Sequence, residues 1–122
     1  MAWESAVQLT VKEITRSGVS DEYTMVAPTA THGNYFINTG SEFIRVVNVN
    51  AATRTVTITP GTLVDGLALP VKVYTIAVTA DALGMDEQFI GPFPATWNYT
   101  GNYLWFICSA VADVTVGVFR VP

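Results

Sequence analysis

Alternation of apolar with polar side chains, interrupted by turn-forming residues at intervals of about 8 to 12, is the feature that most constrains how this chain folds. It is clearest in the segment 53–59, where every threonine falls on one side and Arg54, Val56 and Ile58 fall on the other. Successive side chains of a strand point to opposite faces, so such a segment forms a strand with one face in the core. The pattern predicts an all-β fold: a single antiparallel β-sandwich or jelly roll of about seven to eight strands, formed by residues 1–122 as one domain.

Several strands and turns can be placed individually. Alternation predicts a first strand over about residues 6–15. Glu42–Asn48 and Thr53–Thr59 are expected to pair as a hairpin of two antiparallel strands. Asp65-Gly66 is expected to form a tight turn. The apolar run within Tyr103–Cys108 predicts a central strand that is buried on both faces.

Charge is scarce in this sequence. Lys and Arg number 6 and Asp and Glu number 10, which makes 13% of the chain charged, against about 25% in an average soluble domain. On the roughly 6,400 Å² of surface expected for a folded monomer of this mass, so few charges leave uncharged areas of interface size. We therefore expect the domain to work in contact with other protein.

The charge and hydropathy patterns also exclude two classes of partner. The net charge is −4, and the basic residues are scattered without forming a stripe that could neutralise phosphates. No apolar run approaches the roughly 20 residues that span a bilayer. The sequence therefore predicts neither nucleic-acid binding nor membrane insertion.

Residues suited to catalysis or metal binding are few. His32 is the only histidine and Cys108 the only cysteine, whereas zinc sites draw on several such residues. Asp81, Asp86 and Glu87 lack the spacing of an EF-hand loop. Cys108 lies in an apolar run, which is typical of a small buried hydrophobic residue rather than a reactive thiol. The sequence therefore predicts no enzymatic activity, no metal and no cofactor.

Aromatic residues are the candidates for recognition. Trp97, Tyr99 and Tyr103 lie within seven residues of one another, and Trp3 stands apart near the N-terminus. The three clustered rings have three interpretations: they cap the open end of the sandwich, they anchor a protein partner, or they form a stacking platform for sugar rings. Residues 1–5 are a candidate flexible arm that orders on docking, with Trp3 as its apolar anchor.

The threonine face of segment 53–59 is a second candidate contact surface. Thr55 and Thr57 lie at its centre. We expect self-association to use an uncharged sheet face or edge, and this face, with Thr53, Thr55, Thr57 and Thr59, is one candidate.

A linear pattern of turn and strand residues covers roughly Phe36 to Val121. Its parts are Phe36-Ile37-Asn38-Thr39-Gly40-Ser41-Glu42-Phe43, Asp65-Gly66-Leu67-Ala68, Phe89-Ile90-Gly91-Pro92-Phe93-Pro94, Val114-Thr115-Val116 and Arg120-Val121. This order resembles small all-β structural proteins encoded among the head genes of tailed bacteriophages, of the capsid decoration or cement kind. The chain departs from the looser family pattern at 97–102, where a more acidic, glycine-rich turn is expected.

The resemblance implies a virion structural protein that binds the outside of an icosahedral shell and strengthens it by bridging capsomers. It implies the major capsid protein as partner, a homo-trimer or homo-dimer as the working unit, and no catalysis. It also implies synthesis in the bacterial host cytoplasm, followed by a place on the outer capsid surface of the virion. Two alternatives stay open: a carbohydrate-binding β-sandwich module, and a head-tail joining or tail structural subunit.

Overall fold

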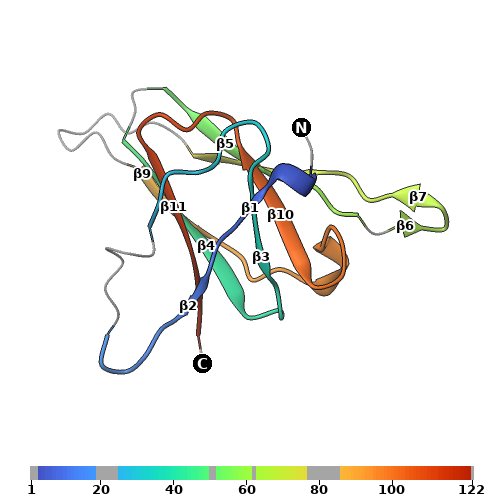
Figure 1. The fold of residues 1–122 in the computed structure, drawn as a ribbon, viewed down its shortest axis with the longest axis horizontal. Coiled ribbons are helices and arrows are strands. Elements are labelled where there is room, and N and C mark those ends of the chain that lie inside the picture. Colours follow the sequence, from blue (N-terminus) through green and yellow to red (C-terminus); the bar gives the residue numbers. More distant parts are fainter. Residues whose placement is uncertain (1–2, 19–24, 50–51, 62, 77–85, 122) are drawn as a thin grey trace.

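Two β-sheets packed face to face form the body of the protein. The computed structural model of the 122-residue chain describes residues 3–18, 25–49, 52–61, 63–76 and 86–121. Within these residues, sheet A has five strands in the order β1 (Val7–Gln8), β3 (Asn34–Ile37), β10 (Tyr103–Cys108), β5 (Arg54–Ile58) and β8 (Lys72–Ile76). Sheet B has four, in the order β2 (Val11–Glu13), β11 (Val114–Arg120), β4 (Glu42–Asn48) and β9 (Asp86–Ile90). Figure 1 shows the two sheets as layers, and the prediction of an all-β sandwich is confirmed.

Three short elements lie outside the two sheets. A separate hairpin is formed by β6 (Leu63–Val64) and β7 (Leu67–Ala68). Single 3₁₀ turns, η1 (Trp3–Ser5) and η2 (Ala95–Trp97), are the helical elements of the described residues. The part of the chain that the structure describes contains no helix long and apolar enough to cross a membrane.

The core lies between the sheets and follows directly from the alternation. Along β4, buried and half-buried residues alternate without a break. On β5, Val56 and Ile58 face inward while Thr55 and Thr57 are only partly covered. The strand β10 lies at the centre of sheet A, as the apolar run predicted. Its inward residues meet those of sheet B in one cluster that includes Phe36, Leu104, Phe106, Ile44, Val46, Val116 and Val118.

The expected hairpin between Glu42–Asn48 and Thr53–Thr59 is wrong. The first segment, β4, pairs with β11 and β9, whereas β5 pairs with β10 and β8 in the other sheet. Each strand has one apolar face, and the two strands bury these faces in the shared core from opposite sheets instead of lying side by side. The connection after Asn48 therefore crosses from one sheet to the other.

The N-terminal segment was predicted as one strand and is two. Val7–Gln8 pairs in parallel with β3 in sheet A, and Val11–Glu13 pairs in parallel with β11 in sheet B. The strand breaks at Leu9 and Thr10, where the chain passes from one sheet to the other, and Leu9 and Val11 pack against the core. These two parallel pairings make the sheets mixed rather than purely antiparallel.

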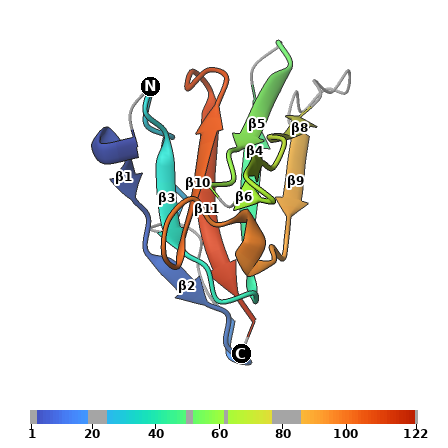
Figure 2. The ribbon, with the colours of Figure 1, turned by 90° about the vertical axis from the view of Figure 1, so that its right-hand side faces the viewer.

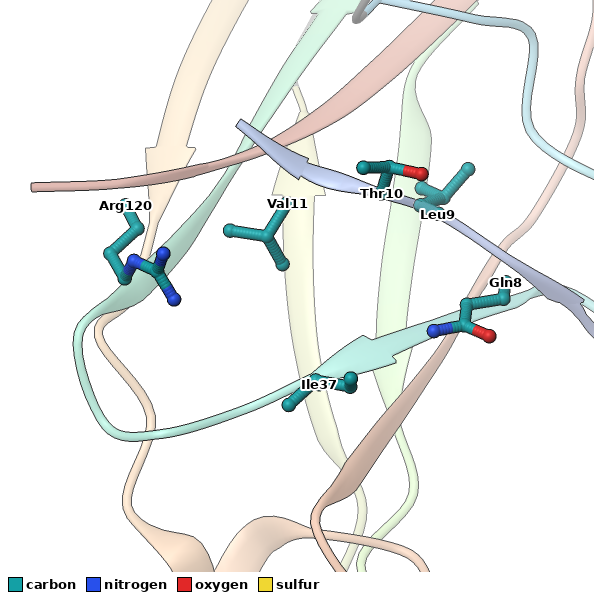
Figure 3. Close-up of a pocket in the computed structure, with 6 residues that line it drawn as sticks. All are labelled: Gln8, Leu9, Thr10, Val11, Ile37 and Arg120. Carbon is teal, nitrogen blue, oxygen red and sulfur yellow. The ribbon is translucent and has the colours of Figure 1, made fainter. Parts of the chain in front are cut away.

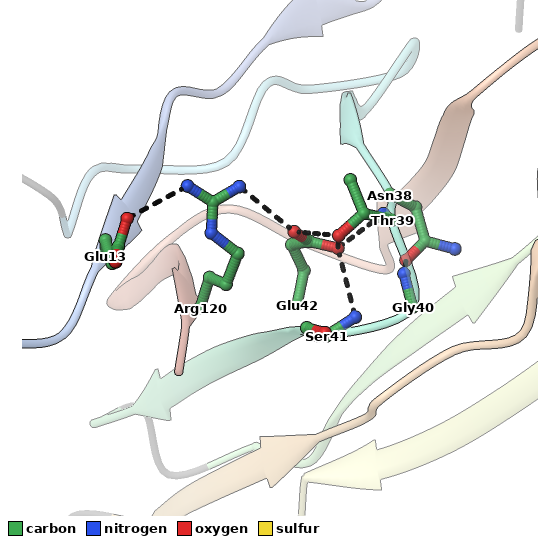
Figure 4. Close-up of polar contacts among 7 residues, drawn as sticks. All are labelled: Glu13, Asn38, Thr39, Gly40, Ser41, Glu42 and Arg120. Carbon is green, nitrogen blue, oxygen red and sulfur yellow. Dashed lines mark hydrogen bonds and ion pairs between the residues drawn. The ribbon is translucent and has the colours of Figure 1, made fainter. Parts of the chain in front are cut away.

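A buried carboxylate ties one corner of the sandwich together (Figure 4). Glu42 is 0% exposed. Its carboxylate accepts hydrogen bonds from the Thr39 amide at 2.5 Å, the Thr39 hydroxyl at 2.8 Å and the Ser41 amide at 3.3 Å. Arg120 Nη1 lies 3.6 Å from Glu42 Oε2, and Arg120 Nη2 lies 3.2 Å from Glu13 Oε2. The network joins β2, the turn between β3 and β4, and the end of β11.

Two opposing effects set the pKa of Glu42. Burial disfavours the charged form and by itself raises the pKa. Hydrogen bonds from Thr39 and Ser41 favour the charged form, and together they hold the pKa below its ordinary value. Glu42 is therefore an ionised, satisfied carboxylate at neutral pH.

Candidate interaction surface

The outer face of sheet A carries no charged side chain on its described strands. Pairing register and burial place the outward positions, because Tyr103 lies opposite Ile37 and Thr57 lies opposite both Ile107 and Val73. The outward residues are Tyr35 and Ile37 on β3, Tyr103, Trp105 and Ile107 on β10, Thr55 and Thr57 on β5, and Val73 and Thr75 on β8. Arg54 and Lys72, the charged residues of these strands, occupy positions in register with the inward-facing Ile76 and Ile58. We call the outward set the sheet A face.

Sheet B is different, because its outer face holds charges. Lys12, Arg45 and Glu87 lie there, and Arg45 Nη2 donates to Glu87 Oε2 at 2.7 Å. Phe43 lies between Phe89 and Phe119, with ring centroids 5.9 Å apart in both pairs. Among the outward positions of the described strands, the charged side chains therefore lie on sheet B and not on sheet A. Glu4 of η1 is an exposed charge next to the sheet A face.

An aromatic cluster covers one half of the sheet A face. The Trp3 ring lies 4.5 Å from Tyr35, 5.2 Å from Tyr99 and 6.0 Å from both Tyr103 and Trp105, measured between ring centroids. The Trp105 indole N–H donates to the His32 carbonyl at 2.8 Å, and its ring is buried beneath the others. These five rings form a continuous, half-buried aromatic patch.

The position of Trp3 differs from the expectation of a flexible arm. Residues 3–5 form η1, and the Ala6 amide donates to the Trp3 carbonyl at 3.0 Å. The indole is already packed on four rings of the same chain, because the outward aromatics of β3 and β10 offer it an apolar surface. Residues 1–2, the rest of the proposed arm, lie outside the described residues.

The structure brings together some of the residues singled out in the sequence and separates others. Tyr99 and Tyr103 join Trp3 in the aromatic cluster. Trp97 lies apart from them, because its ring packs on Phe93 at the core, with Lys72 Nζ 5.2 Å from the ring centroid. Trp97, Tyr99 and Tyr103 therefore do not form the single platform that the carbohydrate-binding hypothesis assumed.

Thr55 and Thr57 lie on the same face as the aromatic cluster, on the next strand beyond β10. Two members of the cluster, Tyr35 and Trp105, were missed in the sequence. The sequence does indicate the place of Trp105, because residues two positions apart on a strand, such as Tyr103 and Trp105, lie on the same face. Tyr35 likewise alternates with the buried Phe36.

We expect Trp3→Ala to lower the free energy of unfolding by about 1 to 2 kcal/mol, because the indole loses its contacts with four rings. Urea unfolding followed by circular dichroism measures the loss. Phe89→Ala is the matched control, since Phe89 is 61% exposed and its removal should cost less. Unchanged stability in Trp3→Ala would show that residues 3–5 are a free arm.

Two grooves lie near the sheet A face. The first, of about 260 Å³, follows the seam where the N-terminal segment crosses between the sheets (Figure 3). It is lined by Gln8, Leu9, Thr10, Val11, Ile37 and Arg120. Arg120, the charged residue of this lining, already contacts Glu13 and Glu42, so it does not offer a free cation to an anionic ligand.

The second groove, of about 460 Å³, lies at the end of β10 and has an uncharged lining: Ala30, Thr31, Ile107, Cys108, Ser109, Ala110 and Val111. It continues the sheet A face through Ile107. Burial raises the pKa of the Cys108 thiol to about 12, so the thiol stays protonated at neutral pH and is a poor nucleophile. Among the described residues, no three His, Cys, Asp or Glu side chains gather in a way that could hold a metal ion.

Comparison of the chain with models of protein families, with curated proteins and with solved structures finds no match. The function is therefore inferred from the geometry and chemistry of the described surface alone. An uncharged sheet face bearing aromatic rings is suited to contact with protein, where Trp and Tyr are the side chains that most often dominate binding energy.

Proposed function

We propose that this chain is a virion structural protein that decorates and stabilises the capsid of a tailed phage by bridging capsomers, without catalysis. The observation that carries the proposal is the absence of charge from the sheet A face. The major capsid protein is its partner, and the outer capsid surface is its place.

Physical arguments support a role in an assembly. Burying an uncharged face avoids the desolvation penalty of an unpaired ion, which amounts to several kcal/mol. Threonine and tyrosine hydroxyls on the face still supply hydrogen bonds at low conformational cost. Many copies act together on a shell, so each contact needs to contribute only a few kcal/mol.

The residues that carry the family resemblance build the framework of the sandwich. Phe36–Phe43 contains the end of β3, the turn that binds Glu42 and the start of β4. Asp65-Gly66 is the turn of the β6–β7 hairpin, and Phe89–Pro94 contains the end of β9. These residues set turns and strand ends, so the resemblance supports the proposal through a shared architecture.

Localisation in intact particles tests the proposal. An antibody raised against the purified chain is bound to particles of the phage or prophage that encodes it, and the complexes are imaged by electron microscopy. We expect regular labelling over the outside of the head, and earlier heat-induced DNA release from particles that lack the chain. Label confined to the neck or tail would favour a head-tail joining or tail subunit, and unlabelled particles would contradict a virion role.

A further inference from the structure

We propose that Asp65-Gly66, the turn between β6 and β7, is a site of spontaneous covalent modification, at which Asp65 is converted to isoaspartate through a cyclic imide. The inference is independent of the proposed virion role, because it concerns the chemistry of the purified chain alone. In the sequence, Asp65 is the only aspartate or asparagine that is followed by glycine. Glycine has no Cβ, so its amide nitrogen is the one that a neighbouring carboxyl group approaches most closely.

The turn lies in water and has space around it. Asp65 and Gly66 are both exposed, and no atom lies within 4 Å of a Cβ built on Gly66. Figure 1 shows the hairpin standing away from both sheets, and Figure 2, which is turned so that this side faces the viewer, shows it in front of the strands. The described residues of neighbouring elements therefore do not block the formation of a ring at this position.

The ring closes only when the hairpin opens. Asp65 and Gly66 have φ of 51° and 79°, the pair of positive values that a type I′ turn requires. The backbone of such a turn holds Cβ of its first residue on the side away from the next amide nitrogen. Opening is easy here, because β6 and β7 form a two-stranded sheet with no third strand among the described residues, and hairpins of this kind are marginally stable.

In the open hairpin, the amide nitrogen of Gly66 attacks the side-chain carboxyl carbon of Asp65. A C–N bond forms, a carboxyl C–O bond breaks, and the hydroxyl group leaves with the amide proton as water. Water then adds to the main-chain carbonyl of Asp65 and breaks its bond to the Gly66 nitrogen, so that the chain continues through the side-chain carbonyl carbon. The product has the mass of the original chain and one more carbon atom in its backbone.

The added backbone atom changes the hairpin. A two-residue turn sets the register of the two strands that it joins. With a longer connection, the pairs Leu63–Ala68 and Val64–Leu67 cannot both be kept. Isomerisation at Asp65 is therefore expected to unpair β6 and β7, whereas the two sheets, which do not include these strands, stay intact.

Asp113 shows that exposure and a left-handed backbone are not enough for this reaction. Asp113 is also exposed and has φ of 60°. Its carbonyl accepts a hydrogen bond from the Val49 amide at 2.9 Å, and the Val114 amide donates to the Val111 carbonyl at 3.4 Å. Val114 is anchored in the core at 3% exposed, and its branched Cβ crowds the attacking nitrogen. We therefore expect no isomerisation at Asp113.

Incubation of the purified, unmodified chain at neutral pH and physiological temperature tests the inference. Trypsin cleaves after Arg54 and Lys72 and releases residues 55–72, in which Asp65 is the only acidic residue and asparagine does not occur. We expect a second chromatographic peak of the same mass to grow with time, and fragmentation to identify it as the isoaspartyl peptide. Its rate of formation should lie within about tenfold of that in a synthetic peptide of residues 55–72, which lacks the rest of the fold.

Two variants separate the cyclic-imide route from other changes in the hairpin. Asp65→Glu keeps the charge but lengthens the side chain by one methylene, so the five-membered ring cannot form and the second peak should fall by more than tenfold. This holds even where the substitution weakens the turn, because opening alone does not restore the ring. Asp65→Asn keeps a residue that tolerates positive φ and closes the same ring with ammonia as leaving group, so it should form isoaspartate faster.

Three outcomes would overturn the inference. The first is a folded chain without isoaspartate at residue 65 after the synthetic peptide has converted, which would show that the turn protects the site. The second is a second peak that persists unchanged in Asp65→Glu. The third is equal conversion at Asp113, measured in the tryptic peptide of residues 73–120, because a fixed peptide bond would then react as readily as the hairpin turn.

Discussion

Gly33→Ala is expected to lower the free energy of unfolding by about 3 kcal/mol or more. Two effects add at this position. The backbone has φ of 73°, a left-handed conformation that costs an L-residue roughly 1 to 2 kcal/mol. A Cβ at Gly33 would also overlap the carbonyl oxygen of Phe106 and Cγ1 of Ile107, and such overpacking typically costs about 1 to 3 kcal/mol.

The strand that Gly33 approaches cannot easily move away. β10 pairs with β3 on one side and with β5 on the other, so a shift to accept the new methyl group would disturb both ladders. Urea unfolding followed by circular dichroism gives the change in free energy.

Gly40→Ala separates the backbone effect from the packing effect, because Gly40 has φ of 99° but no atom lies within 4 Å of its added Cβ. This control should lose only the backbone component, about 1 to 2 kcal/mol. Equal losses in the two variants would mean that close packing against β10 contributes nothing.

The faces of individual strands could be predicted from the sequence, because a residue's side of a strand depends only on its position in that strand. Thr55 and Thr57 face outward, and Val56 and Ile58 face inward, as alternation indicated. The Asp65-Gly66 turn was equally accessible, since its conformation is set by two adjacent residues. The position of a residue within its own segment therefore predicts which face of a strand it occupies and where a tight turn forms.

Strand partners could not be predicted in the same way. Alternation shows which side of β4 and β5 faces the core, but it does not show whether the two strands lie side by side or across the core from each other. The break at Leu9 could not be predicted for the same reason. The alternation of apolar and polar residues continues through the point where the chain passes from sheet A to sheet B. Docking of Trp3 depends on Tyr35 and Trp105, which are distant in sequence and become neighbours only after β3 pairs with β10.

The burial of Glu42 was implicit in the pattern but was not predicted. Glu42, Ile44 and Val46 share one face of β4, which places the carboxylate on the core side. A charge in such a position is expensive unless it is paired and hydrogen-bonded. The partners that make it acceptable, Thr39 and Arg120, lie on a turn and on the last strand, so only the folded structure shows them.

Glu42→Gln should lower the free energy of unfolding by about 2 kcal/mol at pH 7, because hydrogen bonds to a charged group are replaced by weaker neutral ones and the amide meets Arg120 as a second donor. Glu87→Gln is the matched control. It also removes a carboxylate that contacts an arginine, at 2.7 Å, but the pair is partly exposed, and its loss should cost less than about 1 kcal/mol.

The effect of pH separates a charge effect from a change in packing. The pKa of Glu42 in the folded protein lies below its ordinary value, so the folded state binds the proton less tightly than the unfolded state does. Its contribution to stability is therefore complete above the unfolded pKa of about 4.5 and is lost as the pH falls through the folded pKa.

Wild type and Glu42→Gln should differ by the full amount from pH 6 to pH 8 and should converge as the pH falls below about 4.5. Urea unfolding at a series of pH values measures both proteins. A difference that stays constant down to pH 3 would show that the ionised carboxylate contributes nothing. In that case, the shape of the side chain would be what holds the turn between β3 and β4 against the end of β11.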